Sequence, residues 1–76
     1  MTIKEIIEMS LFDDYEQVVI LYGDVDNPNR PYTGYLSEIP IEFHSLKVEQ
    51  IASMGELRRT KWNLNKYGWL EIWLEE

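Results

Sequence analysis

The chain has 76 residues, a net charge of −7, no cysteine and 45% hydrophobic residues. A chain this short has room for one core, so residues 1–76 are expected to form a single domain, and the hydrophobic content argues against disorder. The lack of cysteine excludes a disulfide framework and a thiolate zinc site, which favours a cytoplasmic protein.

The first ten residues predict a helix. Thr2 followed by Glu5 forms a capping box, and Met1 with Ile6 forms a hydrophobic staple around it. The apolar side chains that follow share one stripe at helical spacing, and they are Ile3, Ile6, Ile7 and Leu11. We therefore expect a surface helix that lies on a core. The charges within this stretch exclude a signal peptide or a membrane span.

Two strands and a turn are expected next. The run 16–23 is apolar on both faces, which predicts a central strand. Residues 23–34 are rich in Gly, Pro, Asn and Asp and predict a loop that leads into a second strand over 32–39. Pro40 ends that strand, and residues 41–44 predict a short helical turn.

Residues 46–54 fit two patterns, because their apolar side chains alternate as in a strand and also recur at helical spacing. We favour a strand, although the choice between strand and helix over 46–57 stays open. Gly55 ends this element, and the basic stretch 58–66 is expected to connect it to the last one.

The last element, residues 68–76, alternates as a strand does. One face carries Leu70, Ile72 and Leu74, and the other carries Trp69, Glu71, Trp73 and Glu75. Together the elements predict an α+β fold with one N-terminal helix packed on a mostly antiparallel sheet of about four strands.

The chain offers no constellation for catalysis. The loop around Asp24 and Asp26 has the spacing of a calcium loop at first sight, but Pro28 and Asn29 stand where an EF-hand needs an oxygen ligand and a glycine. His44 is the single histidine and is expected in a turn. We expect no enzyme, no metal and no cofactor.

The C-terminal strand carries the strongest indication of function. If the leucine and isoleucine face is the core face, Trp69 and Trp73 stand on the opposite face beside Glu71 and Glu75. Large aromatic side chains are enriched in the energetic centres of interfaces. The alternative is that the chain's own basic stretch covers them, with a Lys or Arg on an indole ring. Both interpretations stay open.

A second candidate site is the basic stretch, where Arg58, Arg59 and Lys61 flank Trp62. Bases interleaved with an aromatic are typical of modules that bind an anionic ligand or single-stranded nucleic acid. The acidic surroundings oppose direct binding to nucleic acid and favour a protein partner with a basic surface.

Several segments together resemble small uncharacterised proteins of phages and mobile elements of Gram-positive bacteria. They are the opening MTIKEIIEMS helix, the EQVVILYGD strand, the GYLSEIP turn, the LKVEQI segment and the terminal WLEIWL strand. The resemblance implies a short acidic protein that binds and blocks a host protein, as anti-CRISPR and other anti-defence inhibitors that imitate DNA do. It carries over no particular functional residue.

The expected function is therefore that of an inhibitor that occludes a host protein in the bacterial cytoplasm. The residues expected to contact the partner are Trp69, Glu71, Trp73, Glu75, Asp24 and Asp26. The alternatives are the anion-binding module at residues 58–62 and a homo-oligomeric structural protein, with a homodimer built through the tryptophan face or an edge strand.

Overall fold

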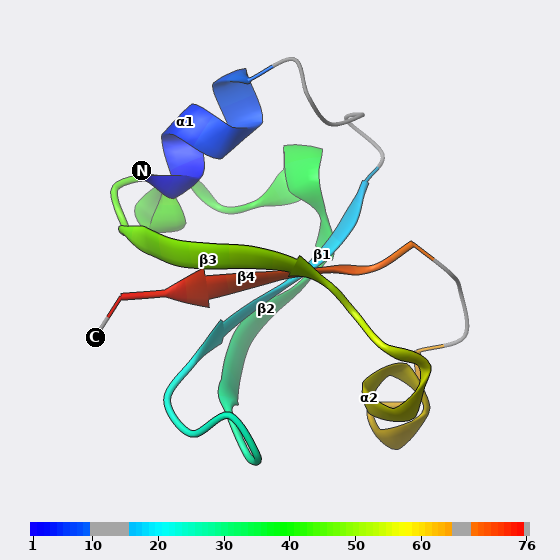
Figure 1. The fold of residues 1–76 in the computed structure, drawn as a ribbon. Coiled ribbons are helices and arrows are strands. Elements are labelled where there is room, and N and C mark those ends of the chain that lie inside the picture. The colour runs from blue at the N-terminus through cyan, green and yellow to red at the C-terminus, as the bar shows by residue number, and fades with distance from the viewer. Residues whose placement is uncertain (10–15, 65–67, 76) are drawn as a thin grey trace.

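A four-stranded sheet forms the centre of the computed structural model, which describes residues 1–9, 16–64 and 68–75 (Figure 1). Its strand order is β2-β1-β4-β3. The strands are β1 (Gln17–Tyr22), β2 (Asn29–Tyr35), β3 (Val48–Ser53) and β4 (Leu70–Leu74). The outer pairs are antiparallel and the central pair, β1 with β4, is parallel. The predicted α+β class is confirmed.

Helix α1 (Ile3–Glu8) packs on one face of this sheet. The predicted capping box is present: the Glu5 amide donates to Thr2 Oγ1 at 3.3 Å, and the Thr2 amide donates to Glu5 Oε1 at 3.1 Å. Ile3 and Ile6 are buried, as the stripe predicts, whereas Leu11 lies outside the described residues. The helix is tied down by the Ile3 amide, which donates to the Leu46 carbonyl at 3.0 Å.

Removal of this cap should weaken the whole domain. Thr2→Ala is expected to lower the free energy of unfolding by about 1 kcal/mol, because the Glu5 amide loses its side-chain acceptor and the Glu5 carboxylate loses the hydroxyl that helps to hold it at the helix start. Urea denaturation followed by circular dichroism measures the change. Thr60→Ala is a matched control at an exposed position in the last turn of a helix, away from any N-cap, and should not destabilise. An equal loss in both variants would contradict the capping role.

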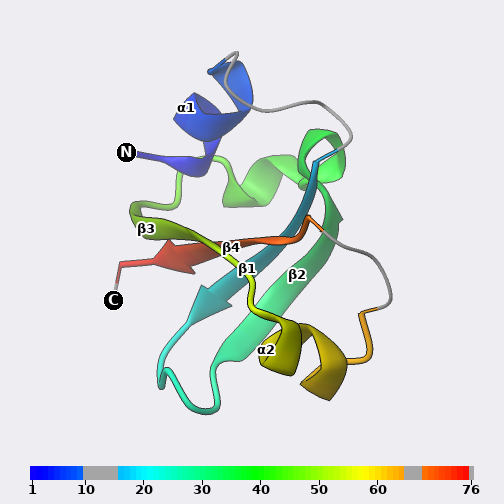
Figure 2. The ribbon, with the colours of Figure 1, turned by 45° about the vertical axis from the view of Figure 1, so that its right-hand side comes forward.

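Strand β1 is buried on both faces, as its sequence predicts. Val18 and Ile20 belong to the core beneath α1, and Val19 and Leu21 belong to a second apolar cluster on the opposite face. A strand with partners on both edges and apolar cover on both faces has no solvated side, which explains its unbroken apolar run. The sheet therefore carries a layer on each face, and Figure 2 shows α1 and a second helix on opposite sides of it.

The segment after β1 differs from the predicted boundaries. The second strand begins and ends earlier than 32–39, because β2 ends at Tyr35 and a 3₁₀ turn, Leu36–Glu38, follows it. That turn points Leu36 and Ile39 into the core together, which an extended strand would not do at this spacing. The predicted helical turn is confirmed as the 3₁₀ helix Ile41–Phe43, and His44 follows it in a turn.

Tyr32 in β2 should make stability depend on alkaline pH. Its hydroxyl donates to the Tyr35 carbonyl at 2.7 Å, and burial, followed by the charge of Glu38, raises its pKa above the ordinary tyrosine value. Because its pKa is raised, Tyr32 stays protonated more readily in the folded state than in the unfolded state. The stabilisation that Tyr32 contributes is therefore complete below about pH 10 and is lost as pH rises further. Above about pH 10, the free energy of unfolding measured by urea denaturation should fall more steeply in the wild type than in Tyr32→Phe.

The ambiguous segment 46–54 contains the strand β3 over Val48–Ser53, and a helix follows it. This helix, α2 (Glu56–Lys61), occupies part of the stretch that was expected only to connect two elements. Gly55 precedes it without a side-chain cap, and none of its residues is buried. It thus has neither the cap nor the apolar stripe by which helices are recognised in a sequence.

Candidate functional site

The face of the sheet opposite α1 gathers all three tryptophans of the chain. Trp62, Trp69 and Trp73 are half-buried and pack against the second apolar cluster, which consists of Val19, Leu21 and Met54. On β4, Leu70, Ile72 and Leu74 face the core beneath α1. The alternation predicted for this strand therefore places residues 69–74 on the correct faces. Glu75, which was expected on the tryptophan face, instead lines a pocket with Phe43 and Leu46, which pack on the core beneath α1.

Helix α2 lies on this tryptophan face because of how it ends. Asn63 has a φ of 56°, the Asn63 amide donates to the Thr60 carbonyl, and the Leu64 amide donates to the Arg59 carbonyl. This pair of bonds is a Schellman motif, in which an asparagine or glycine in the left-handed conformation ends the helix. The motif turns Trp62 and Leu64 back onto the second cluster.

Arg58 of α2 connects the helix to the sheet. Its Nη1 donates to Glu71 Oε1 at 3.4 Å and its Nη2 donates to the Val25 carbonyl at 2.8 Å. Its guanidinium also lies 5.5 Å from the centre of the Trp73 ring and 5.3 Å from that of Trp62. The basic segment itself therefore covers part of the tryptophan face.

Glu71 is the single charged side chain that is buried among the described residues, at 7% exposure. Besides Arg58, the Trp73 indole Nε1 donates to Glu71 Oε1, at 2.9 Å. A buried carboxylate needs such donors to offset the loss of water. Glu71 therefore fixes the orientation of both Trp73 and Arg58.

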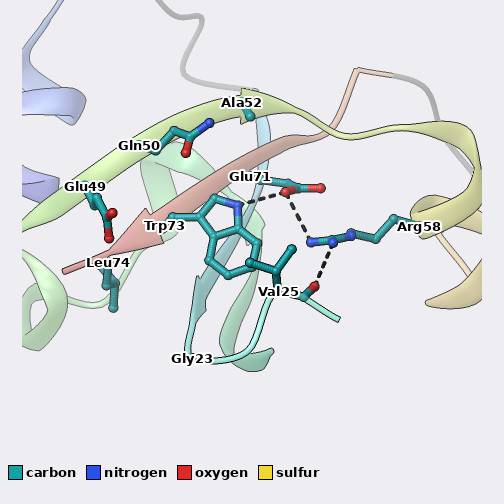
Figure 3. A pocket seen from close by; sticks show the side chains of 9 residues that line it. All are labelled: Gly23, Val25, Glu49, Gln50, Ala52, Arg58, Glu71, Trp73 and Leu74. Carbon is teal, nitrogen blue, oxygen red and sulfur yellow. Dashed lines mark hydrogen bonds and ion pairs between the residues drawn. The ribbon is translucent and has the colours of Figure 1, made fainter. Parts of the chain in front are cut away.

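Beside this group lies an open hollow of about 450 Å³ (Figure 3). Trp73 and Arg58 stand at its wall, and Glu49 projects from β3 on the other side of Trp73 from Arg58. The complete lining is Gly23, Val25, Glu49, Gln50, Ala52, Arg58, Glu71, Trp73 and Leu74. We call this space the Trp73 hollow.

The acidic residues expected to contact a partner are spread over different places. Glu71 lies within the sheet rather than on a rim. Glu75 lies away from the Trp73 hollow and lines a separate apolar trough with Tyr22 and Phe43. Asp24 and Asp26 are exposed in the loop after β1, where the Asp26 amide donates to Asp24 Oδ1 at 2.9 Å and so forms a turn.

The basic residues of the second candidate site are partly engaged by the chain itself. Arg58 faces inward, and Lys61 Nζ donates to the Asp26 carbonyl at 3.4 Å. Arg30, from β2, lies 4.6 Å from the centre of the Trp62 ring. Arg59 also lies in α2. Arg58, Lys61 and Trp62 line a small open pocket of about 240 Å³ together with Asp26 and Leu57, and Arg59 is not part of its lining.

Three residues of the hollow, Glu49, Gln50 and Ala52, come from β3, and the sequence pattern did not indicate them as site residues. Strict alternation places Val48 and Gln50 on one face, but the register shifts between them in the pairing with β4. Val48 and Ile51 consequently share the α1 face, and Gln50 and Ala52 line the hollow on the other. A β-bulge of this kind inserts one extra residue and has no clear signature in a single sequence.

Two further properties bear on the kind of site. Among residues 1–9, 16–64 and 68–75, no three His, Asp or Glu side chains gather as metal ligands would. The described part of the chain contains no helix that is long and apolar enough to span a membrane.

Comparison with known proteins finds no match: no family model matches the chain, and neither a curated protein nor a solved structure resembles it significantly.

Proposed function

We propose that this chain is a non-enzymatic protein that binds a basic surface of a host protein and occludes it. The observation that carries the proposal is the Trp73 hollow, where a half-buried indole is held in place by Glu71 and an exposed Glu49 stands at the mouth. Tryptophan side chains held in place in this way are enriched at the energetic centres of interfaces, and the exposed Glu49 beside Trp73 adds attraction for a basic group. The net charge of −7 adds long-range attraction to a basic partner.

The context of this function follows from the resemblance to small phage and mobile-element proteins. The host protein would be a nucleic-acid-binding or defence protein of a Gram-positive bacterium, with a basic groove that normally holds nucleic acid. Occlusion needs no chemistry, because the bound protein fills the groove and its carboxylates take the place of phosphates. The exposed Asp24 and Asp26 lie in the loop that follows β1, next to the hollow residue Gly23.

The module for anionic ligands has less support. Arg58 and Lys61 already donate to acceptors of their own chain, so an anion would have to displace these contacts. A titration with single-stranded nucleic acid at low salt, followed by tryptophan fluorescence, tests this alternative. Light scattering tests the homo-oligomer.

The test of the proposal is an affinity experiment with charge-reversed variants. Wild-type protein immobilised on a resin is expected to retain a partner from a Gram-positive lysate and to release it as salt rises. Glu49→Lys should abolish retention, since it reverses the charge at the mouth of the hollow.

Glu42→Lys makes the same change of charge at an exposed position of the 3₁₀ helix Ile41–Phe43, outside the lining of the hollow. It should retain the partner nearly as well as the wild type does. Retention that is equal in both variants, or a partner that resists high salt in both, would exclude the hollow as the docking site.

A further inference from the structure

Arg58 shows which kind of group the wall of the Trp73 hollow accepts. Its guanidinium satisfies the Glu71 carboxylate and the Val25 carbonyl, and it lies against the Trp73 ring. A planar guanidinium combines in-plane donors for a carboxylate with a flat face for an aromatic ring, which an ammonium group cannot do. The chain therefore contains an example of arginine recognition at Trp73.

Arg58 does not fill the space. About 450 Å³ stays open beside it, which is more than a second guanidinium needs. Figure 3 shows Glu49 on the opposite side of Trp73 from Arg58, and Gln50 above the ring. Glu49 is exposed, and its carboxylate makes no ion pair or hydrogen bond with any other described residue.

The charges around the hollow favour a cation as its occupant. Its lining has two carboxylates, Glu49 and Glu71, against the single positive charge of Arg58. An anion would be repelled by this excess of negative charge. An apolar group would displace water from the carboxylates without offering them a hydrogen-bond donor. A cation over the Trp73 ring gains from the ring's negative face and from Glu49 at once.

We propose that the Trp73 hollow receives an arginine side chain of the partner, stacked on Trp73 and paired with Glu49. This inference rests on the proposed function, because it names the group through which the basic partner is held. Gln50 contributes an amide oxygen at the same mouth, so the guanidinium meets acceptors on more than one of its edges.

The experiment uses short peptides with blocked ends in which a central arginine is flanked by glycines. The Trp73 indole N–H signal, followed by nuclear magnetic resonance, reports binding at the hollow. The arginine peptide should shift this signal saturably. A peptide with citrulline, which has a similar shape without the charge, should not, and a lysine peptide should bind several-fold more weakly.

Two variants locate the binding. Glu49→Gln should weaken binding of the arginine peptide by about fivefold, and Glu42→Gln by less than about twofold, since a charge outside the hollow contributes only screened attraction. An unchanged circular dichroism spectrum of the free variants verifies that the fold is intact. Equal weakening in both variants, equal binding of lysine or citrulline peptides, or no shift at Trp73 would each overturn the inference.

These results separate the inference from the proposed function. If a host partner binds in a Glu49-dependent way but the arginine peptide does not bind, the proposed docking function would still hold. The inference that an arginine fills the hollow would then be wrong. If the arginine peptide binds specifically but no partner is retained from lysates, the arginine site in the Trp73 hollow would be supported and the proposed inhibitor function would be excluded.

Discussion

Replacement of Ile72 by alanine is expected to lower the free energy of unfolding by about 2–5 kcal/mol. Ile72 is 1% exposed and lies in β4 between Ile20 of β1 and Ile51 of β3. Its side chain belongs to the core beneath α1, so truncation removes apolar burial and leaves a cavity at the centre of the sheet. A domain of this size has a total stability of about 4–11 kcal/mol, so the loss is a large share of it.

Urea denaturation followed by circular dichroism measures this loss. Leu57→Ala is the matched control, because Leu57 is a large apolar residue that is 89% exposed on α2. It should change stability by no more than about 0.5 kcal/mol. A loss for Ile72→Ala that is as small as that of the control would show that β4 does not lie at the centre of the sheet.

Arg58→Ala is expected to lower the free energy of unfolding by about 1–3 kcal/mol. The substitution leaves the carboxylate of Glu71 buried with the Trp73 indole as its remaining donor among the described residues, and a buried charge without its partner is costly. The side chain of Arg58 is 25% exposed, so water compensates part of the loss and holds it below that of a fully buried pair. The same change detaches α2 from the Val25 carbonyl.

Two comparisons test the physical cause. Lys4→Ala breaks an exposed ion pair, Lys4 with Glu8, whose side chains are 67% and 62% exposed. This substitution should cost less than about 0.5 kcal/mol. Glu71→Gln combined with Arg58→Ala should cost less than the sum of the single changes, since a neutral amide needs no cation beside it. Strict additivity would mean that Arg58 acts through packing alone.

Most of the fold could be predicted because its signals are local. The capping box of Thr2 and Glu5 lies within one helical turn, and the run of β1 shows by its composition that both faces are buried. The alternation of β4 likewise shows which side chains share a face. These patterns depend on backbone geometry and hydrophobicity over a few residues, which a single sequence contains.

Other features could not be predicted from local patterns. Helix α2 buries none of its residues and carries no side-chain cap, so its place depends on Arg58 and Trp62 meeting partners that lie far away in the sequence. Gln50 and Ala52 line the hollow although Val48 faces the core, because the register shifts between Val48 and Gln50 in the pairing of β3 with β4. Such pairings between distant segments are decided by the packing of the whole sheet.

By itself, then, the sequence determined that this chain is a small acidic α+β domain whose last strand has an aliphatic face and a tryptophan face. Only the tertiary structure decided that Glu71 is buried, that α2 covers part of the tryptophan face through Arg58, and that an open hollow stays beside Trp73. The physical reason is that alternation assigns a side chain to a face, whereas its exposure depends on what the rest of the chain packs against that face.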